Sequence, residues 1–520
     1  MNHIKPFIGR KKDFEQLRIL YERRVPSLAV IKGRRRIGKS RLVTEFAQTT
    51  LNHHKKQPTF YSFTGLAPKK GMTPQIQRDH FGRTLADILK IPPMTFLDWT
   101  DVFQHLTHSI IPGDIVLFDE LSWMEAKDPT FIPKLKDWWD RIVLEKSQIL
   151  LIFCSSVSIW IEDNILNNTA FFGRIALTLT LPPLNIPESR QVLTSFGFHG
   201  SVFEFYKLLS VFGGVPWYLE QVDNKNMADE NIKRLCFQKD ALLVLEFNRI
   251  FHDLFNGKGI VYKKILESLK MGMKTLAKIR QEIQVARGGM LSTWMSHLVE
   301  CGFVQEHAQW LLKEEKLSKQ SLYRISDPYV RFYLKYIEPN LTRIDLGTFD
   351  DVAIQQIPGF DTHIGLQVEI LLLQNRKLLL KAIGINPSDV SFDGPYRQTK
   401  TTRNKGCQID YLVQTRSKNL FLCEFKFNRR ELGSEIINEV KEKIDRLSIP
   451  RGFAVIPILF HIGGVLESVY DKQYFYRIID ISNFFRRYTL RKRVLGVVAH
   501  PLSQCSCTIC TLRLLGGMRA

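Results

Sequence analysis

The stretch Gly33-Arg-Arg-Arg-Ile-Gly-Lys-Ser40 follows an apolar run, Leu28–Ile31, and precedes a stretch with helical spacing, Arg41–Phe46. Its two glycines, at positions 33 and 38, let the backbone curl until several N–H groups point at one anion. The helix that begins here adds the partial positive charge of its N-terminus. The spacing matches the P-loop pattern and predicts a phosphate cradle between a strand and a helix.

The side chains of this loop supply further contacts to a nucleotide. A lysine at the seventh position can reach the β- and γ-phosphates, and the serine after it can ligate magnesium. The three arginines in the variable interior of the loop add contacts to phosphate or to a partner. We therefore predict a binding site for ATP and Mg²⁺ that includes Gly33, Arg34, Arg35, Arg36, Ile37, Gly38, Lys39, Ser40 and Arg41.

A second motif, Ile115-Val-Leu-Phe-Asp-Glu120, is an apolar run that ends in two acids. Such a run is typical of a buried parallel strand whose carboxyl end enters a site. Beside a P-loop, Asp119 is expected to hold magnesium together with Ser40, and Glu120 to activate the attacking water. A general base is needed only if water attacks, so Glu120 favours hydrolysis over binding alone.

Three further positions are expected near the nucleotide. The run Ile149–Cys154 predicts a strand that ends at Ser155, a position from which a hydroxyl can sense the γ-phosphate; serine also ends ordinary strands. Arg174 can reach a phosphate as an arginine finger, or it can pair with an acid on the surface. Pro216 ends the run Gly213-Gly-Val-Pro216, which breaks a helical pattern close to an expected lid.

Residues 7 to about 340 resemble the archaeal-type ATPases of the AAA+/STAND group. The resemblance rests on the two motifs above together with Phe7-Ile-Gly-Arg10, Cys154-Ser-Ser156, Gly173-Arg174 and Gly213-Gly-Val-Pro216. It implies an αβα ATPase core, a helical lid and a winged helix. The lid lacks the arginine-bearing sensor of typical AAA+ unfoldases, which speaks against a ring-shaped unfoldase.

Beyond residue 256, the apolar spacing predicts three short helices followed by a hairpin of Cys301–Val304 and Leu322–Ile325, which is the pattern of a winged helix. Such a module sets its third helix in the DNA major groove, binds a protein partner, or packs against an ATPase. The expected third helix offers no Arg or Lys to solvent. It offers Ser292, Thr293, Ser296 and His297.

The segment from about 345 to 485 predicts a separate α/β unit with paired strands at Cys407–Val413 and Leu420–Phe427. Asp410 lies on the first strand. Glu424 and Lys426 lie two apart on the second and share a face, while Cys423 and Phe425 are expected to face the core. A carboxylate pair beside a lysine is what metal-dependent hydrolysis of a phosphodiester needs.

This arrangement resembles the core of PD-(D/E)XK nucleases. The resemblance implies Asp410, Glu424 and Lys426 as catalytic residues, with Glu369 on an expected helix as an upstream acid. Gln408 stands where a partner acid is expected. Two alternatives stay open, a domain that cleaves DNA and a non-catalytic module that binds DNA or protein.

Length and charge complete the prediction. The 520 residues carry 73 Lys and Arg against 52 Asp and Glu, a net +21 that favours an anionic partner such as DNA but also suits a solvated surface. We predict an α/β protein with five segments. They are a P-loop core (1–185), a helical lid (186–255), a winged helix (256–340), a nuclease-like domain (345–485) and a basic tail (486–520).

The cysteines and the hydropathy favour a cytoplasmic protein. Five of the eight cysteines are isolated in apolar stretches and are expected to be reduced. Cys505, Cys507 and Cys510 lack a fourth zinc ligand, so we interpret them as part of an irregular tail. No apolar run reaches the roughly 20 residues that span a bilayer, and we expect no membrane association. The oligomeric state is left open.

Overall fold

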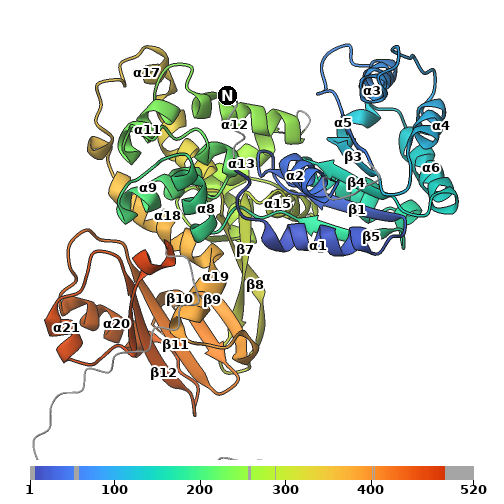
Figure 1. Ribbon diagram of the computed structural model, residues 1–520. Coiled ribbons are helices and arrows are strands. Elements are labelled where there is room, and N and C mark those ends of the chain that lie inside the picture. Colours follow the sequence, from blue (N-terminus) through green and yellow to red (C-terminus); the bar gives the residue numbers. More distant parts are fainter. Residues whose placement is uncertain are drawn as a thin grey trace, which may run out of the picture. The chain divides into compact units, whose positions relative to one another are not determined.

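Five parallel strands between residues 27 and 180 form the first sheet. The computed structural model describes residues 6–51, 58–255, 259–286, 288–400, 402 and 405–485. Its first sheet has the strand order β2-β3-β4-β1-β5 (Figure 1). The strands are β1 (Ser27–Lys32), β2 (Phe60–Thr64), β3 (Ile115–Asp119), β4 (Leu150–Ser155) and β5 (Ile175–Thr180).

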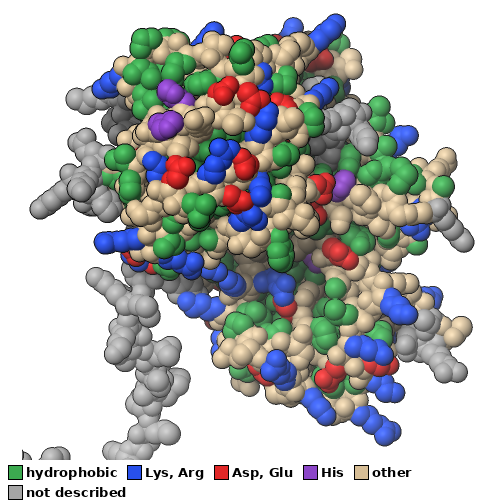
Figure 2. Space-filling view, turned by 90° about the vertical axis from the view of Figure 1, so that its right-hand side faces the viewer, with side chains coloured by type: hydrophobic (Ala, Val, Ile, Leu, Met, Phe, Trp, Pro, Cys, Tyr) green, Lys and Arg blue, Asp and Glu red, His purple; other side chains and the backbone are tan. Residues whose placement is uncertain are grey.

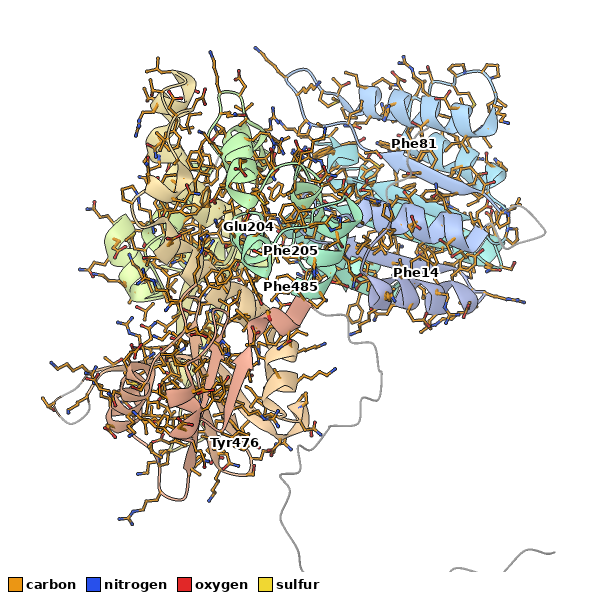
Figure 3. All side chains as sticks on the ribbon, turned by 60° about the vertical axis from the view of Figure 1, so that its left-hand side comes forward. Phe14, Phe81, Glu204, Phe205, Tyr476 and Phe485 are labelled. Atoms are coloured by element: carbon orange, nitrogen blue, oxygen red, sulfur yellow. The ribbon has the colours of Figure 1, made fainter. Side chains whose placement is uncertain are left out.

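Helices cover both faces of this sheet. Successive residues of β1 enter different apolar clusters, Leu28 and Val30 on one face and Ala29 and Ile31 on the other. On the first face lie α3 (Pro74–Leu89), α4 (Trp99–Ser109), α5 (Leu121–Glu125) and α6 (Phe131–Glu145); on the second lie α1 (Lys11–Glu22) and α2 (Lys39–Leu51). Phe81 of α3 and Phe14 of α1 lie on opposite sides of the sheet (Figure 3).

A group of helices follows β5 and begins with a capping box. The Asn185 side chain accepts the N–H of Glu188, and the Glu188 carboxylate accepts the N–H of Asn185, which fixes the start of the first helix. The helices are α8 (Ile186–Ser195), α9 (Val202–Phe212), α10 (Pro216–Leu219), α11 (Ala228–Cys236) and α12 (Leu242–Phe255). The helical pattern breaks at the glycines after Phe212, as the sequence predicted.

The three short helices and the hairpin expected after residue 256 are present. The helices are α13 (Gly259–Leu269), α14 (Leu276–Ile283) and α15 (Met290–Glu300), and the strands are β6 (Lys274–Thr275), β7 (Val304–Leu311) and β8 (Lys316–Ile325), in the order β6-β8-β7. The hairpin is longer than predicted. His297 differs from the expectation, because it is half-buried and its Nδ1 lies 2.7 Å from the Tyr262 hydroxyl.

A second five-stranded sheet lies near the end of the described chain. Its order is β13-β12-β11-β10-β9, antiparallel from β9 to β11 and parallel from β11 to β13. The strands are β9 (Val390–Gln398), β10 (Cys407–Thr415), β11 (Asn419–Lys426), β12 (Ala454–His461) and β13 (Arg477–Asp480). The helices between the hairpin and the end are α16 (Pro328–Phe332), α17 (Leu341–Asp345), α18 (Phe360–Gln374), α19 (Arg376–Ile383), α20 (Glu435–Arg446) and α21 (Glu467–Asp471).

The face of β11 that carries Glu424 is buried, which differs from the prediction that only Cys423 and Phe425 face a core. Leu420 and Leu422, which share the parity of Glu424, pack with Ile436 and Val440 of α20. Cys423 packs into the apolar cluster on the other face. An amphipathic helix thus covers the polar residues of this strand, and Glu424 is only 2% exposed.

One apolar cluster extends from Leu17 of α1 to Phe485, the last described residue. Phe485 packs against Phe205 and Tyr206 of α9, with ring centroids 5.6 and 4.6 Å apart (Figure 3).

The boundaries that the sequence predicts between the five segments stay a prediction. Within the described ranges, no helix has both the length and the apolar character that crossing a bilayer requires. The basic tail and its three cysteines lie outside the described residues.

We predict that Gly214→Ala destabilises the protein. The Gly214 carbonyl accepts the N–H of Leu184 at 2.7 Å, and a Cβ on Gly214 would lie 2.0 Å from the Leu184 carbonyl oxygen, so the backbone must move. We expect the midpoint of thermal unfolding to fall by about 6 °C or more. Gly365→Ala is the control, since a Cβ there meets nothing within 4 Å in the middle of α18. An equal loss in both variants would contradict this account.

Candidate functional site

The loop between β1 and α2 has the backbone of a phosphate cradle. Gly33 and Gly38 have φ angles of 148° and 91°, which favour glycine. A Cβ on Gly33 would lie 2.9 Å from the Leu181 carbonyl oxygen, whereas the space beside Gly38 is open. Arg36 is also left-handed, with a φ of 67°. The N-terminus of α2 begins at Lys39, directly after the loop.

The lysine and serine of the motif are held by local hydrogen bonds. The Lys39 ammonium is buried and donates to the carbonyl oxygens of Gly33 and Arg34, at 3.0 and 3.3 Å. The Ser40 hydroxyl donates to Asp119 Oδ2 at 2.5 Å. Burial raises the pKa of the Asp119 carboxyl, and the Ser40 hydrogen bond opposes this shift. The structure therefore brings the predicted residues of the two motifs into contact.

These residues fit a magnesium nucleotide by their chemistry. A hydroxyl and a carboxylate side by side are ligands that Mg²⁺ prefers. The open space at Gly38 and the helix N-terminus suit an anion. The Lys39 ammonium, now on two backbone carbonyls, is within the loop that would surround phosphate oxygens.

Glu120 is engaged by Ser156. Its Oε2 accepts the Ser156 N–H at 3.0 Å and the Ser156 hydroxyl at 2.7 Å. The predicted sensor, Ser155, points elsewhere, since its hydroxyl bonds the Ser122 hydroxyl at 3.2 Å. Sequence reasoning named the first serine of the pair. Ser155 ends β4 and Ser156 directly follows it, and consecutive residues of an extended chain point to opposite sides, so the sequence already indicated that the two hydroxyls differ in direction.

Arg174 is not part of this group. It pairs with Asp140 of α6 through two bonds, at 2.6 and 2.9 Å. Residue 174 directly precedes β5, and Ile175 pairs with Leu28 at the start of β1, whereas the P-loop follows the end of β1. A six-residue strand is about 20 Å long, so Arg174 lies at the opposite edge of the sheet. Arg174 therefore does not reach the P-loop of its own chain as an arginine finger. Its pairing with Asp140 is the other expectation, an ion pair with an acid on the surface.

Two arginines of the loop interior form ion pairs with distant segments. Arg34 pairs with Asp327, the N-cap residue of α16, and Asp327 also accepts the N–H of Val330 at 3.0 Å. Arg36 pairs with Glu246 of α12 through contacts of 2.5 and 2.7 Å. Both pairs are almost completely buried, with side-chain exposures of 6% and 0% in the first and 16% and 0% in the second.

Aromatic side chains after Pro216 complete these contacts. Pro216 is the first residue of α10. The Arg36 guanidinium lies 3.3 Å from the centre of the Trp217 ring. The Tyr218 hydroxyl accepts from Arg34 at 3.4 Å and donates to Glu246 at 3.3 Å. The predicted residue, Pro216, therefore lies next to the site, but the contacts to the loop arginines come from the two residues that follow it, Trp217 and Tyr218.

The other predicted positions of the loop have separate partners. Arg41 donates to Glu220 at 2.7 Å and to the Pro6 carbonyl at 3.0 Å. The Ile37 carbonyl accepts from Arg10 at 3.2 Å. Arg35 is half-buried. Segments before and after the first sheet thus contact the loop.

The acids predicted in the second α/β unit lie close together. Asp410 is at a β-bulge, where β10 has one extra residue opposite β9 between the pairs Ile409–Tyr396 and Leu412–Gly394. Its Oδ2 accepts the N–H of Phe425 on β11 at 3.0 Å. Burial, and then the neighbouring charge of Glu424, raise the pKa of the Asp410 carboxyl.

Glu369 approaches this pair from α18. Burial and the charge of Asp410 raise the pKa of the Glu369 carboxyl, and Arg324 of β8, 3.7 Å away, opposes the shift. The predicted Lys426 contacts Glu424 Oε1 at 3.2 Å and Glu439 at 2.7 Å. Gln408 is exposed. Among the residues that the structure describes, no three His, Cys, Asp or Glu side chains are placed to hold one metal ion.

Several residues of both sites carried no direct sequence signal. Trp217, Glu246 and Asp327 reach the P-loop from positions 181 to 293 residues away in the chain, and Lys443 of α20 contacts Glu424. Their pairing is decided by tertiary packing. Only Trp217 and Tyr218 had an indirect marker, because they directly follow the Gly-Gly-Val-Pro break.

Comparison with known proteins agrees with the first site. Residues 7–222 match a family described as an ATPase domain predominantly from Archaea. An uncharacterized protein of Methanocaldococcus jannaschii, MJECL04, is 26% identical over 373 residues, which cover 70% of this chain and 75% of the relative.

Solved structures with partial similarity include the Walker-type ATPase paby2304 of Pyrococcus abyssi, with a TM-score of 0.46, 16% identity and coverage of 63% of this chain and 96% of that one. The ORC2 protein of Aeropyrum pernix in ADPNP-ADP complexes has a TM-score of 0.42, 14% identity and coverage of 66% and 97%. Residues 7–222, which contain the loop geometry described above, are therefore similar to this ATPase domain.

Proposed function

We propose that this protein is a magnesium-dependent ATPase that acts as a nucleotide switch. The observation that carries the proposal is the pair of buried contacts from the P-loop arginines to Asp327 and Glu246. A loop that binds phosphate and also holds two distant acids connects nucleotide binding to the position of those acids. The helices α12 and α16 are then the elements that respond.

The roles of the loop residues follow from their positions. Gly33 and Gly38 turn backbone N–H groups toward phosphate oxygens, and Lys39 exchanges its two carbonyl partners for them. Ser40 and Asp119 would hold Mg²⁺, which when bound neutralises charge on the phosphoryl group. Glu120 would orient and activate the attacking water.

The hydrogen bonds of Ser156 to Glu120 define the resting state of the base. They hold the Glu120 carboxylate toward the end of β4. We infer that Ser156 positions Glu120, and that either Ser155 or Ser156 senses the γ-phosphate. An arginine finger from Arg174 would have to act on a second molecule, because Arg174 lies at the far edge of its own sheet.

The switch extends to the unit that contains the β7–β8 hairpin, which we propose is a winged helix. Its partner is DNA or a DNA-associated protein. The net charge of +21 favours DNA. On the face seen in Figure 2, however, basic side chains are interspersed with acidic ones. Ser292, Thr293 and Ser296 of α15 are exposed and uncharged, which suits a protein partner as well.

The five described cysteines are free and buried, in keeping with a cytoplasmic location.

A second candidate function is DNA cleavage by the C-terminal unit. Asp410, Glu424 and Glu369 bring carboxylates from two strands and a helix together, and Lys426 contacts Glu424. We propose that the acids hold a divalent cation and that Lys426 orients the phosphodiester or the water. A non-catalytic module that binds DNA or protein is the alternative.

We predict that Lys39→Ala abolishes ATP binding, whereas Glu120→Gln keeps it and lowers ATP turnover by about 100-fold or more. The lysine supplies phosphate contacts in the ground state, and the glutamate acts only on the attacking water. Calorimetric titration with ATP and a phosphate-release assay measure the two effects. Unchanged ATP binding in Lys39→Ala would overturn the nucleotide site.

We predict that Arg36→Met destabilises the nucleotide-free protein by about 3 kcal/mol, because it leaves Glu246 buried without its partner. Arg36→Met combined with Glu246→Leu should recover most of the loss. Arg18→Met is the matched control, since the Arg18 pairs are 46–56% exposed and should contribute less than about 1 kcal/mol. Urea unfolding measures these changes.

The same contacts give a direct test of the switch. A non-hydrolysable ATP analogue should change amide hydrogen exchange in α12 and α16 of the wild type but not of Lys39→Ala. Equal exchange in these helices with and without the analogue would refute a switch through them, even if ATP binds.

We predict that DNA nicking in Mg²⁺ or Mn²⁺ disappears in Asp410→Ala and in Lys426→Ala and persists in Lys441→Ala, which changes an exposed residue of α20. Gel assays of supercoiled DNA with and without ATP measure it. If the wild type leaves DNA intact, the C-terminal unit is the non-catalytic module.

A further inference from the structure

Lys443 of α20 lies between the two carboxylates of the C-terminal site. Its ammonium is 2.5 Å from Glu424 Oε2 and 3.8 Å from Asp410 Oδ1. The other oxygens are already in use, since Lys426 contacts Glu424 Oε1 and the Phe425 N–H bonds Asp410 Oδ2. The two oxygens that remain therefore face the same ammonium.

The fold holds Lys443 in this place. Its helix packs against the sheet through Ile436, Ile437 and Val440. The Lys443 carbonyl accepts from the Cys407 thiol at 3.3 Å, which ties this turn of the helix to the start of β10. The Lys443 side chain is 27% exposed. Burial lowers its pKa, but Asp410 and Glu424 more than offset this, so the pKa is raised and the group is a cation at neutral pH.

The Lys443 ammonium occupies the point at which Asp410 Oδ1 and Glu424 Oε2 converge. Carboxylate oxygens from neighbouring strands, both directed at one point, are the donors that Mg²⁺ and Mn²⁺ prefer. An ammonium there neutralises the buried Glu424 and reduces the repulsion between the two acids. A divalent cation and this ammonium cannot share the point, because both would contact the same two oxygens.

We propose that Lys443 is a positioning residue that serves as the built-in counter-cation of Asp410 and Glu424 and that a divalent metal must displace it to bind. From the second candidate function, this proposal needs only that Asp410 and Glu424 bind a divalent cation. It does not need DNA cleavage. Lys443 then sets how readily the site takes up metal, and Lys426 keeps its own contact with Glu424.

Binding of Mn²⁺ to the full chain without nucleotide, followed by electron paramagnetic resonance, tests this role. Lys443→Met removes the charge and keeps the length of the side chain, and we expect it to bind Mn²⁺ at least about 10-fold more tightly than the wild type. Lys441→Met, on an exposed position of the same helix, should bind like the wild type. Asp410→Asn added to Lys443→Met should remove the gain.

Thermal unfolding separates this role from a purely structural one. Without metal, Lys443→Met should unfold at a lower temperature than the wild type, because Glu424 loses a partner. Adding Mn²⁺ should then raise its midpoint more than it raises that of the wild type. A lower midpoint without any gain in Mn²⁺ affinity is the result of a structural ion pair and overturns the proposal. Lys443→Gln serves as a second variant if Lys443→Met does not fold.

Equal or weaker Mn²⁺ binding in Lys443→Met, or no Mn²⁺ binding in any variant, also overturns the proposal. Failure of the candidate nuclease is distinguishable from these outcomes. A wild type that cuts no DNA, together with a gain of Mn²⁺ affinity in Lys443→Met, refutes cleavage and supports the role of Lys443.

Discussion

The burial of β1 on both faces and along both edges determines where the nucleotide site lies. Its apolar residues enter two different clusters, and β4 and β5 flank it. Because β4 and β5 already pair with both edges of β1, the chain that leaves the carboxyl end of β1 turns out of the sheet and begins α2. Gly33 and Gly38 make that turn. From α2, the Ser40 hydroxyl reaches Asp119 on β3, two strands away from β1.

The same turn explains why the loop contacts so many segments. In a parallel sheet, every connection leaves its strand at the carboxyl edge. A loop at this edge therefore lies close to the segments that follow the other strands. Trp217, Glu246 and Asp327 all come from segments after β5. Among the ion pairs of the described residues, Asp327 is paired with Arg34 and Glu246 with Arg36 of the loop. Because a buried acid is destabilising without its partner, the burial of these two acids depends on the loop keeping its form. This dependence is the basis of our proposal that α12 and α16 respond to the nucleotide.

Sequence alone predicted the strands β1, β3, β4, β10 and β11, the helices α13 to α15 and the hairpin after them, because these depend on local spacing. The contact between Ser40 and Asp119 followed from two motifs of known geometry. The placement of Arg174 was predictable too, since a residue before a parallel strand lies at the edge opposite the loop. The partners of Arg34 and Arg36 were not, because an ion pair across about 210 or more residues leaves no periodic trace. The alternation of side chains along β11 also could not show that α20 would cover the face that carries Glu424.

The two acid sites differ in what balances their charge. At the first, Asp119 has the Ser40 hydroxyl beside it and no ammonium in direct contact among the described residues, so its carboxylate has no built-in counter-cation. At the second, Lys443 and Lys426 already neutralise Glu424. Continuous contacts join the two. Asp327 caps α16, Arg331 of α16 donates to Gln367 of α18 at 3.4 Å, and Glu369 lies two residues further along that helix. Gln367 and Glu369 thus place the contact with α16 and an acid of the second site on the same helix. Gln367 is buried and also donates to the carbonyls of Pro328 in α16 and Ser210 in α9, so this one side chain links α18 to both helices.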